Sequence, residues 1–538
     1  MMAVPRPLRA TDFLRVADLF RLGDLPTERP HPDTRHLARW ARSDLPRAVA
    51  ALKAVDLRAL TALEERASGI DRLAASVHAT LAAGRRIFLC GCGATGRLSL
   101  TLEFLWRRRH PASDRVRSFM AGGDVALVHS LEGFEDEGAY GARHLEESGF
   151  VDGDLLIACT EGGETPYVIG ATERAARVSS RPPFFLYCNP DADLLRSVER
   201  FRRVHENPGI HKLCLHVGEM ALTGSTRMQA STVLQLAVGA ALLLDGEQAG
   251  ETISRFRDRV AATDFSFLAG FVEEESGIYA AQDHVLYRTR DYGITVFTDT
   301  TERAPTFSLA PFDRLEEGRA RHSLCYVQLE EAGSAARAWE RLLRRKPRAL
   351  NWPEVDRRTT PEHLLGFDFS RRARSLRRRL IPHRKHHEFH VDGAAGGIAL
   401  RLGSQRQHVA AGDLPELLRH LLLKQMLNIH STLIMGRLGR YEGNLMTWVT
   451  PTNGKLVDRA ARYVQHLLAR DGRTGPGYED VVRRLFAEME AARPDESVVL
   501  RTYRSLLRDD RARRHGEAGA PAVPGSEGSS PRTDGPRA

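Results

Sequence analysis

The sequence predicts an α/β fold in which a parallel sheet is covered by helices. Apolar runs at residues 87–90, 116–121, 154–159 and 184–188 have the length of buried strands, and segments with helical spacing lie between them. This alternation is typical of a parallel sheet with helices on both faces. With 538 residues, 42% of them hydrophobic, the chain can bury more than one core, so we expect at least two domains.

Composition argues against several classes of protein. The longest apolar run, residues 233–244, is far short of the roughly 20 residues that cross a bilayer and predicts a buried helix. The first residues lack the apolar stretch of a signal peptide, and the six cysteines show neither Cys-x-x-Cys nor metal-ligand spacing. We therefore expect a cytoplasmic protein without a membrane segment, a metal or a cofactor.

The formal net charge of +9 raises the question of nucleic acid as a partner. Much of the excess lies in basic runs at residues 107–109, 344–346 and 371–387, which we interpret as solvated faces and loops. A nucleic-acid surface would carry interleaved aromatic residues or a recognisable module, and neither is found. Histidines are frequent in residues 383–390, but they lie among cations in an expected loop, so a metal site is not favoured either.

A glycine-rich loop at residues 91–97 follows the first buried strand and precedes a helix-compatible segment. Glycines at this place let backbone N–H groups face a phosphate, and the helix N-terminus adds partial positive charge. We expect Gly93 and Gly96 to allow this approach and the hydroxyl of Thr95 to be a further donor. The spacing is that of neither a P-loop nor a dinucleotide fingerprint.

Two further loops of hydroxyls and glycines follow later elements. Residues 160–166 include Thr160 and Gly162, and residues 222–228 include Ser225 and Thr226. Ordinary helix N-capping explains each loop singly. Because ligands bind at the carboxyl edge of such sheets, three loops of this kind predict one phosphate-binding pocket.

The order of these motifs resembles a known family. Gly-x-Gly-x-Thr-Gly-Arg, Glu-Gly-x-Glu-Asp at residues 132–136, Thr-Pro-Tyr-Val-Ile and Thr-Gly-Ser-Thr-Arg-Met occur in the order seen in the sugar isomerase (SIS) domain of N-acetylmuramic acid 6-phosphate etherases. They are equally similar to the glucokinase regulatory protein. Residues 25–34 look like the arm that precedes the domain in this group, and the resemblance covers most of residues 25–245.

The second half of the chain resumes the pattern. Residues 294–297 predict a strand, and residues 299–307 resemble the Ser-Glu-Cys-Pro-Pro-Thr-Phe segment of the etherases, with Glu302 at the matching carboxylate. Residues 443–456 are similar to the terminal part of an etherase domain. The resemblance therefore implies two tandem SIS domains packed as an internal pseudo-dimer.

The chain accordingly divides into five parts, although residues 340–410 match nothing that assigns them a role. We expect a helical and extended arm at 1–59, SIS domains at 60–245 and 246–456, a helical segment at 457–514 and a disordered tail at 515–538.

The family motifs are divided between the halves, as if a symmetric dimer with two sites had been fused. The resemblance therefore also implies that one of the two sites is retained. The catalytic candidates are Glu135 and Glu302, and the substrate-binding candidates are Gly93, Thr95, Gly96, Glu132, Thr160, Gly162, Ser225, Thr226 and Lys455. Lysine is rare here, with six among 78 basic residues, so a compact ammonium at Lys455 suits a phosphate or sugar oxygen. Gly162 stands where the etherases have serine, and Glu161 and Glu164 add negative charge that opposes an anion.

Three functions remain open from the sequence. The first is a protein that resembles the glucokinase regulatory protein, binds a hexose or amino sugar 6-phosphate and acts on a protein partner such as a sugar kinase. The second is a lyase resembling the etherases, in which two carboxylates eliminate lactate from a muramic acid 6-phosphate. The third is a basic nucleic-acid-binding adaptor, which only the net charge favours.

Overall fold

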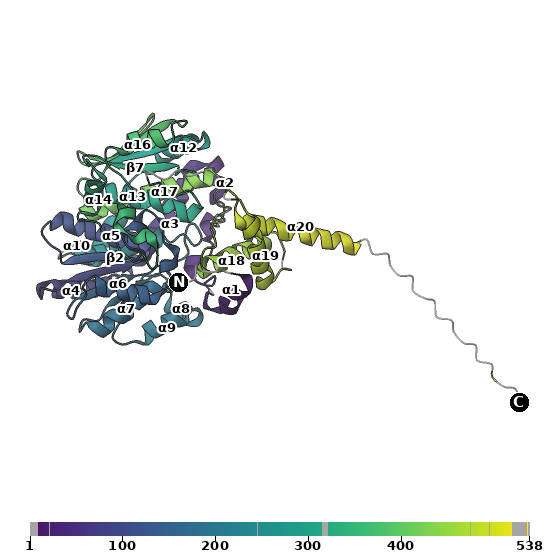
Figure 1. Ribbon diagram of the computed structural model, residues 1–538, viewed down its shortest axis with the longest axis horizontal. Coiled ribbons are helices and arrows are strands. Elements are labelled where there is room, and N and C mark those ends of the chain that lie inside the picture. The colour runs from purple at the N-terminus through teal and green to yellow at the C-terminus, as the bar shows by residue number, and fades with distance from the viewer. Residues whose placement is uncertain are drawn as a thin grey trace.

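The computed structural model describes residues 9–518, except residues 21, 245, 315–320, 474 and 494, and in addition residue 535; the side chains of Glu132 and of residues 510–518 are not described. Two β-sheets lie in the body of the molecule with helices around them, and a group of C-terminal helices extends to one side (Figure 1). This arrangement confirms the predicted α/β class. The expected tail at 515–538 lies almost wholly outside the described residues.

The first sheet has five parallel strands in the order β2-β1-β3-β4-β5. β1 is central, and Ile87 is paired with Val116 on one side and with Leu155 on the other. Every residue of β1 and β3 is buried, as expected for a parallel sheet covered on both faces. The strands are β1 (Ile87–Gly91), β2 (Val116–Met120), β3 (Leu155–Cys159), β4 (Phe184–Tyr187) and β5 (His211–Cys214).

Helices connect and cover these strands. All residues of α10 are buried, so the apolar run at 233–244 forms the buried helix that its composition predicts. α7 begins with proline at its first position, where the missing N–H costs no intrahelical bond. These helices are α4 (Ala67–Ala82), α5 (Gly93–Arg109), α6 (Gly138–Glu147), α7 (Pro166–Val178), α8 (Asp191–Ser197), α9 (Glu199–Glu206) and α10 (Gln229–Leu243), with the short turns η4 (Asp124–Leu127) and η5 (Glu132–Phe134).

The second sheet is mixed, in the order β10-β9-β8-β6-β7. β6 (His284–Thr289) is parallel to β7 (Cys325–Leu329) and to β8 (His386–Ala394), whereas β9 (Gly397–Leu402) and β10 (Gln405–Ala410) add as antiparallel hairpins. The two-residue turns that join β8 to β9 and β9 to β10 permit this, with Gly396 and Gly403 at positive φ. Residues 340–410, which the sequence left without a role, thus supply three strands, and β8 contains histidines expected in a loop.

One predicted strand is wrong. Residues 294–297 lie inside α13 (Gly293–Phe307), and the strand before it is β6. Ile294 and Val296 are β-branched and favour strands in isolation, but both are fully buried by helix packing, which overrides the propensity. β6 escaped prediction because its residues, His-Val-Leu-Tyr-Arg-Thr, include polar side chains that are nevertheless largely buried.

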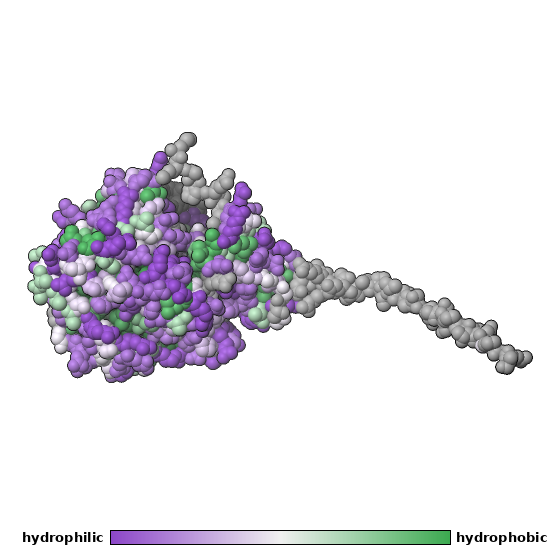
Figure 2. All heavy atoms as spheres, turned by 90° about the horizontal axis from the view of Figure 1, so that it is seen from below, coloured by the Kyte–Doolittle hydropathy of each residue, from purple (hydrophilic) through white to green (hydrophobic). Residues whose placement is uncertain are grey.

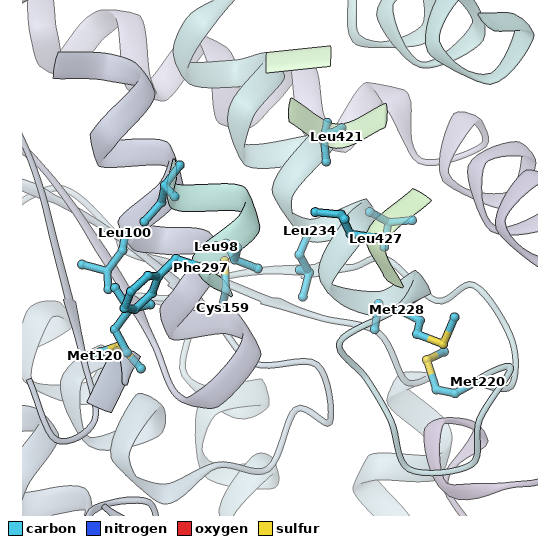
Figure 3. Packing of buried hydrophobic residues seen from close by; sticks show 14 of the residues in the cluster. Leu98, Leu100, Met120, Cys159, Met220, Met228, Leu234, Phe297, Leu421 and Leu427 are labelled. Atoms are coloured by element: carbon cyan, nitrogen blue, oxygen red, sulfur yellow. The ribbon is translucent and has the colours of Figure 1, made fainter. Parts of the chain in front are cut away.

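The two halves meet through helices. α5 contacts α13, and α10 contacts α17 (Glu416–Arg437). Figure 3 shows side chains of this continuous core, with Leu98, Leu100 and Leu234 from the first half, and Phe297, Leu421 and Leu427 from the second. The other helices of the second half are α11 (Ala249–Ala262), α12 (Leu268–Ala280), α14 (Ala335–Leu343), α15 (Pro361–Leu365) and α16 (Ala373–Leu380), with the turn η6 (Arg357–Thr359).

The N-terminal arm and the C-terminal helices pack together at one end (Figure 1). α1 lies on α19, where the rings of Phe13 and Phe486 are 6.4 Å apart. Further along the arm, Thr34 donates to the carbonyl of Ala221 at 2.7 Å. The elements are α1 (Ala10–Val16), η1 (Ala17–Phe20), η2 (Pro26–Glu28), η3 (Pro32–Thr34), α2 (Leu37–Ser43) and α3 (Leu45–Glu64) at the start, and α18 (Gly454–Arg470), α19 (Tyr478–Ala491) and α20 (Val498–Ala518) at the end.

Hydrophilic residues dominate the face seen in Figure 2, and hydrophobic ones are scattered in small groups. Among the described residues, no helix is both long enough and apolar enough to cross a membrane.

Candidate functional site

A cavity of about 630 Å³ lies between the two halves. The first half contributes the N-terminus of α5 and the loop before α10. The second half contributes α13 and the segments around the start of α18. Its polar and glycine lining consists of Cys92, Gly93, Arg97, His129, Ser130, Glu135, Gly224, Ser225, Thr226, Arg227, Glu302, Thr306, Ser308, Arg358, Thr450, Thr452 and Arg459.

The N-terminus of α5 opens into this cavity. Gly93 lines it and has φ of +53°, a left-handed conformation that favours glycine. Thr95 does not line it, because its hydroxyl accepts from the N–H of Cys92 and donates to the Cys92 carbonyl, both at 2.9 Å, and so caps the helix. Gly96 faces the core, where an added Cβ would lie 2.6 Å from Met120 Cβ. Backbone groups at Gly93, rather than these two residues, therefore face the cavity.

The loop before α10 forms the neighbouring wall. Ser225 is 4% exposed, lines the cavity, and its Oγ has no hydrogen-bond partner among the described residues. Thr226 lines the cavity beside it. A buried hydroxyl without a partner costs free energy, so Ser225 is suited to donate to a bound ligand.

The two predicted carboxylates both line this cavity. Glu135 follows η5 in the first half and Glu302 lies on α13 in the second, and both line the cavity. Burial raises the pKa of Glu302 above its ordinary value, although the charges of Arg97 and Arg227 oppose the shift. Glu132 was also a candidate, but its side chain lies outside the described residues.

Lys455 lies beside Glu135, and its ammonium group is bound by carboxylates of the protein. Its Nζ is 3.1 Å from the Glu135 carboxylate and 2.7 Å from that of Glu164. Glu164 is also paired with Arg200, whose guanidinium donates to it. Two cations therefore neutralise Glu164, which removes the repulsion expected from this residue.

The loop at residues 160–166 is closed upon itself. The hydroxyls of Thr160 and Thr165 share a hydrogen bond at 2.9 Å, and Thr160 is buried. The carbonyl of Gly162 accepts from Asn189 Nδ2 at 3.0 Å, and the same amide donates to Thr27 of the arm. Neither Thr160 nor Gly162 lines the cavity, because this loop is tied to the arm instead.

Four arginines in the lining were not among the predicted site residues. Arg97 and Arg227 each lie inside a motif that the sequence displays, so a signal for them existed. Arg459 forms a bidentate pair with Glu28, at 2.8 and 2.6 Å, and Arg358 pairs with Asp356. Nothing in the sequence points to these two. In the described part of the chain, no group of three or more histidine, cysteine or acidic residues is placed to hold a metal ion.

Comparison with known proteins bears on this geometry. Residues 70–176 match the family model of the glucokinase regulatory protein N-terminal SIS domain. The N-acetylmuramic acid 6-phosphate etherase of Thermobifida fusca is 32% identical over 241 residues, which are 44% of this chain and 73% of the relative. The chain belongs to the SIS-domain family of these etherases. A second etherase, from Deinococcus radiodurans, is 31% identical over 218 residues, or 39% of this chain.

The SIS relatives are matched over part of their length, since the chain covers just under two thirds (65%) of the etherase from Deinococcus radiodurans. Among solved structures, the C-terminal domain of glucosamine-fructose-6-phosphate aminotransferase from Francisella tularensis has a TM-score of 0.35 at 11% identity, covering 71% of this chain and 96% of that chain.

Proposed function

We propose that the chain binds a sugar phosphate, a hexose or amino sugar 6-phosphate, in the cavity between its halves. The observation that carries the proposal is the unpartnered hydroxyl of Ser225 beside the N-terminus of α5 in one cavity. A helix N-terminus supplies N–H donors and partial positive charge for a phosphate. Membership of the SIS-domain family supports the same ligand class.

The carboxylates of the cavity suit the sugar. Carboxylates at Glu135 and Glu302 accept hydrogen bonds from hydroxyl groups, and apolar residues such as Met446 and Leu456 line the wall between. Phosphate at the N-terminus of α5 and sugar hydroxyls at the two carboxylates would together hold the ligand.

The test is a thermal-shift panel of hexose and amino sugar 6-phosphates. A ligand that binds the native state raises the melting temperature by mass action. Ser225→Ala should weaken the binding of the best ligand about ten-fold, since a hydrogen bond to a charged group contributes about 1.5–3 kcal/mol. The matched control is Ser76→Ala, whose hydroxyl bonds only to a carbonyl of its own helix, α4. Equal affinity of Ser225→Ala and wild type for this ligand would show that the phosphate does not bind at Ser225.

A second candidate is a lyase that eliminates lactate from N-acetylmuramic acid 6-phosphate. The observation that favours it is that Glu135 and Glu302, from different halves, line the same cavity. One carboxylate would take the proton from the sugar C2 as a base. The other, held protonated, would give its proton to the departing ether oxygen, and the raised pKa of Glu302 suits this acid.

Lactate release from N-acetylmuramic acid 6-phosphate separates the two candidates. Release by wild type that is lost in Glu135→Gln and in Glu302→Gln would establish the lyase with these residues. No release by wild type would leave a binding protein. Release that survives both substitutions would mean that other residues act.

Three finer proposals accompany this function. We infer SIS domains at 60–245 and 246–456, each holding one sheet, and a cytoplasmic location, which the six free cysteines support. The match to a domain of the glucokinase regulatory protein makes a sugar kinase the first protein partner to test. Inhibition of kinase turnover by this chain, dependent on the best sugar phosphate of the panel, is the expected result.

A further inference from the structure

Glu161 is a buried acid that lies outside the lining of the proposed site. It follows β3 and Thr160 at the carboxyl edge of the first sheet and is 8% exposed. Its Oε1 is buried and has no hydrogen-bond partner among the described residues. An uncompensated buried carboxylate is costly, so a proton or a bound group must balance it.

Three other buried acids near the cavity are balanced by cations. Glu164 is paired with Lys455 and Arg200, and Glu28 with Arg459. Asp299 on α13 is held by two arginines. Among the described residues, Glu161 has no cation bound to it, a lack that it shares with Glu302 of the cavity, so these two acids stay without an ion-pair partner where the others have one.

The groups that face Glu161 come from four elements. Glu302 on α13 and Glu135 after η5 repel its charge, whereas Lys455 on α18 attracts it. The thiols of Cys159 and Cys188, at the ends of β3 and β4, also interact with it electrostatically. Because Lys455 is already bound by Glu135 and Glu164, its attraction does not outweigh the rest. Burial is the largest cause and raises the pKa of Glu161 to about 7. Glu302 and Glu135 act in the same direction, whereas a hydrogen bond from the backbone of Glu161 itself and the charge of Lys455 oppose the shift.

We propose that Glu161 adjusts the net charge around the site: its carboxylate takes up a proton from solvent when an anionic ligand enters the cavity. This inference rests on the proposed sugar-phosphate function. Glu161 does not line the cavity, so it acts as a positioning residue through the field that it shares with Glu135 and Glu302. A phosphate adds negative charge to that field and stabilises the protonated form of Glu161. By linkage, binding is tightest where Glu161 is neutral and weakens as the pH rises through 7.

Titration calorimetry with N-acetylglucosamine 6-phosphate as the probe tests this directly. At pH 7, in two buffers of different ionisation enthalpy, wild type should take up a few tenths of a proton per ligand, because the group is about half ionised there. The measurement needs no variant, so it holds even if a substitution disturbs folding. Zero uptake, or proton release, with measurable binding overturns the inference.

The isosteric variant Glu161→Gln separates the residue from the ligand. The phosphate titrates near pH 6 and affects both proteins alike, so the readout is the difference between their pH profiles. Between pH 6 and 8, wild type should lose several-fold more affinity than Glu161→Gln, which should take up fewer protons. The control Glu146→Gln, on the exposed face of α6, should follow wild type.

The outcomes distinguish the two proposals. If wild type and Glu161→Gln bind the probe with the same pH profile and the same proton uptake, the proposed role of Glu161 is wrong, whereas sugar-phosphate binding is confirmed. If neither this probe nor any ligand of the panel binds wild type, the proposed function falls, and the role of Glu161 with it.

Discussion

Arg227 in the loop before α10 donates a hydrogen bond to the carboxylate of Asp299 on α13 at 3.1 Å. The two residues belong to different halves of the chain, and both side chains are 2% exposed. Arg303 holds the other oxygen of Asp299 at 2.8 Å. Because Arg227 also lines the cavity, this pair fixes the phosphate-side wall against the helix that carries Glu302.

Replacing Asp299 by asparagine should strongly destabilise the protein. Burial alone would raise the pKa of Asp299, but Arg303 and Arg227 outweigh burial and hold it below the usual value, so the carboxylate is charged at neutral pH. Its removal leaves the buried guanidinium of Arg227 without its anion and that of Arg303 with Glu275 alone, which costs about 3–5 kcal/mol. Denaturant unfolding at pH 7 measures the loss. The exposed Asp413→Asn, which breaks a surface pair with Arg259, should change stability by less than about 1 kcal/mol.

The first half was predictable because local signals and tertiary structure agree there. The strands at residues 87–90 and 154–159 are continuous apolar runs, and a glycine-rich loop marks the turn into α5. The placement of Glu135 and Glu302 in the lining of one cavity was predictable from the division of motifs between the halves. The capping role of Thr95 was not, since a threonine near a helix start looks the same whether it caps the helix or binds a ligand.

The second half was harder because its decisive interactions are long-range. The basic run at 344–346 was interpreted as a solvated face, yet the side chain of Arg345 is 6% exposed, where it binds Asp124 and Glu103 of the first half. Arg377, in another such run, is fully buried against Asp313. No periodicity marks which arginine of a run turns inward, because the acid that pairs with it is far away in sequence.

Glu103 gives stability a defined pH dependence. Burial would raise its pKa, but Arg345, Arg348 and Arg107 overcome burial and lower it from 4.5 to about 2. A lowered pKa in the folded state means that the contribution is complete above pH 4.5 and is lost as the pH falls toward 2. Glu103→Gln should therefore lower the free energy of unfolding by about 3 kcal/mol at pH 7.

The difference between wild type and Glu103→Gln should shrink when unfolding is measured at pH 3. Glu354→Gln, which breaks an exposed pair with Arg143, should have little effect at either pH. A difference that stays constant from pH 7 to pH 3 would show that packing, not charge, makes the contribution of Glu103.

The arm should be released by breaking its pair with α18. Glu28 is 8% exposed and accepts two hydrogen bonds from Arg459, so Glu28→Gln leaves that guanidinium short of its partner. We expect faster tryptic cleavage after Arg35, which is followed by His36, because cleavage requires local opening of the arm. Asp33→Asn in the same arm, which breaks only the exposed pair with Arg58, should leave the cleavage rate close to that of wild type. Equal rates for Glu28→Gln and wild type would mean that other contacts hold the arm.

Lys455 should control ligand affinity through the two acids that it joins. Burial would lower its pKa, but Glu135 and Glu164 raise it above the ordinary value, so it stays charged. In Lys455→Met, Arg200 still neutralises Glu164, but Glu135 faces the cavity without a cation. Sugar-phosphate affinity should then fall about ten-fold, as expected for about 1.4 kcal/mol of added repulsion. Lys455→Arg keeps the charge and should retain most of the affinity in the same calorimetric titration. Affinity that falls equally in both variants would mean that the shape of the lysine side chain matters, and affinity unchanged in Lys455→Met would show that Glu135 lies too far from the ligand to repel it.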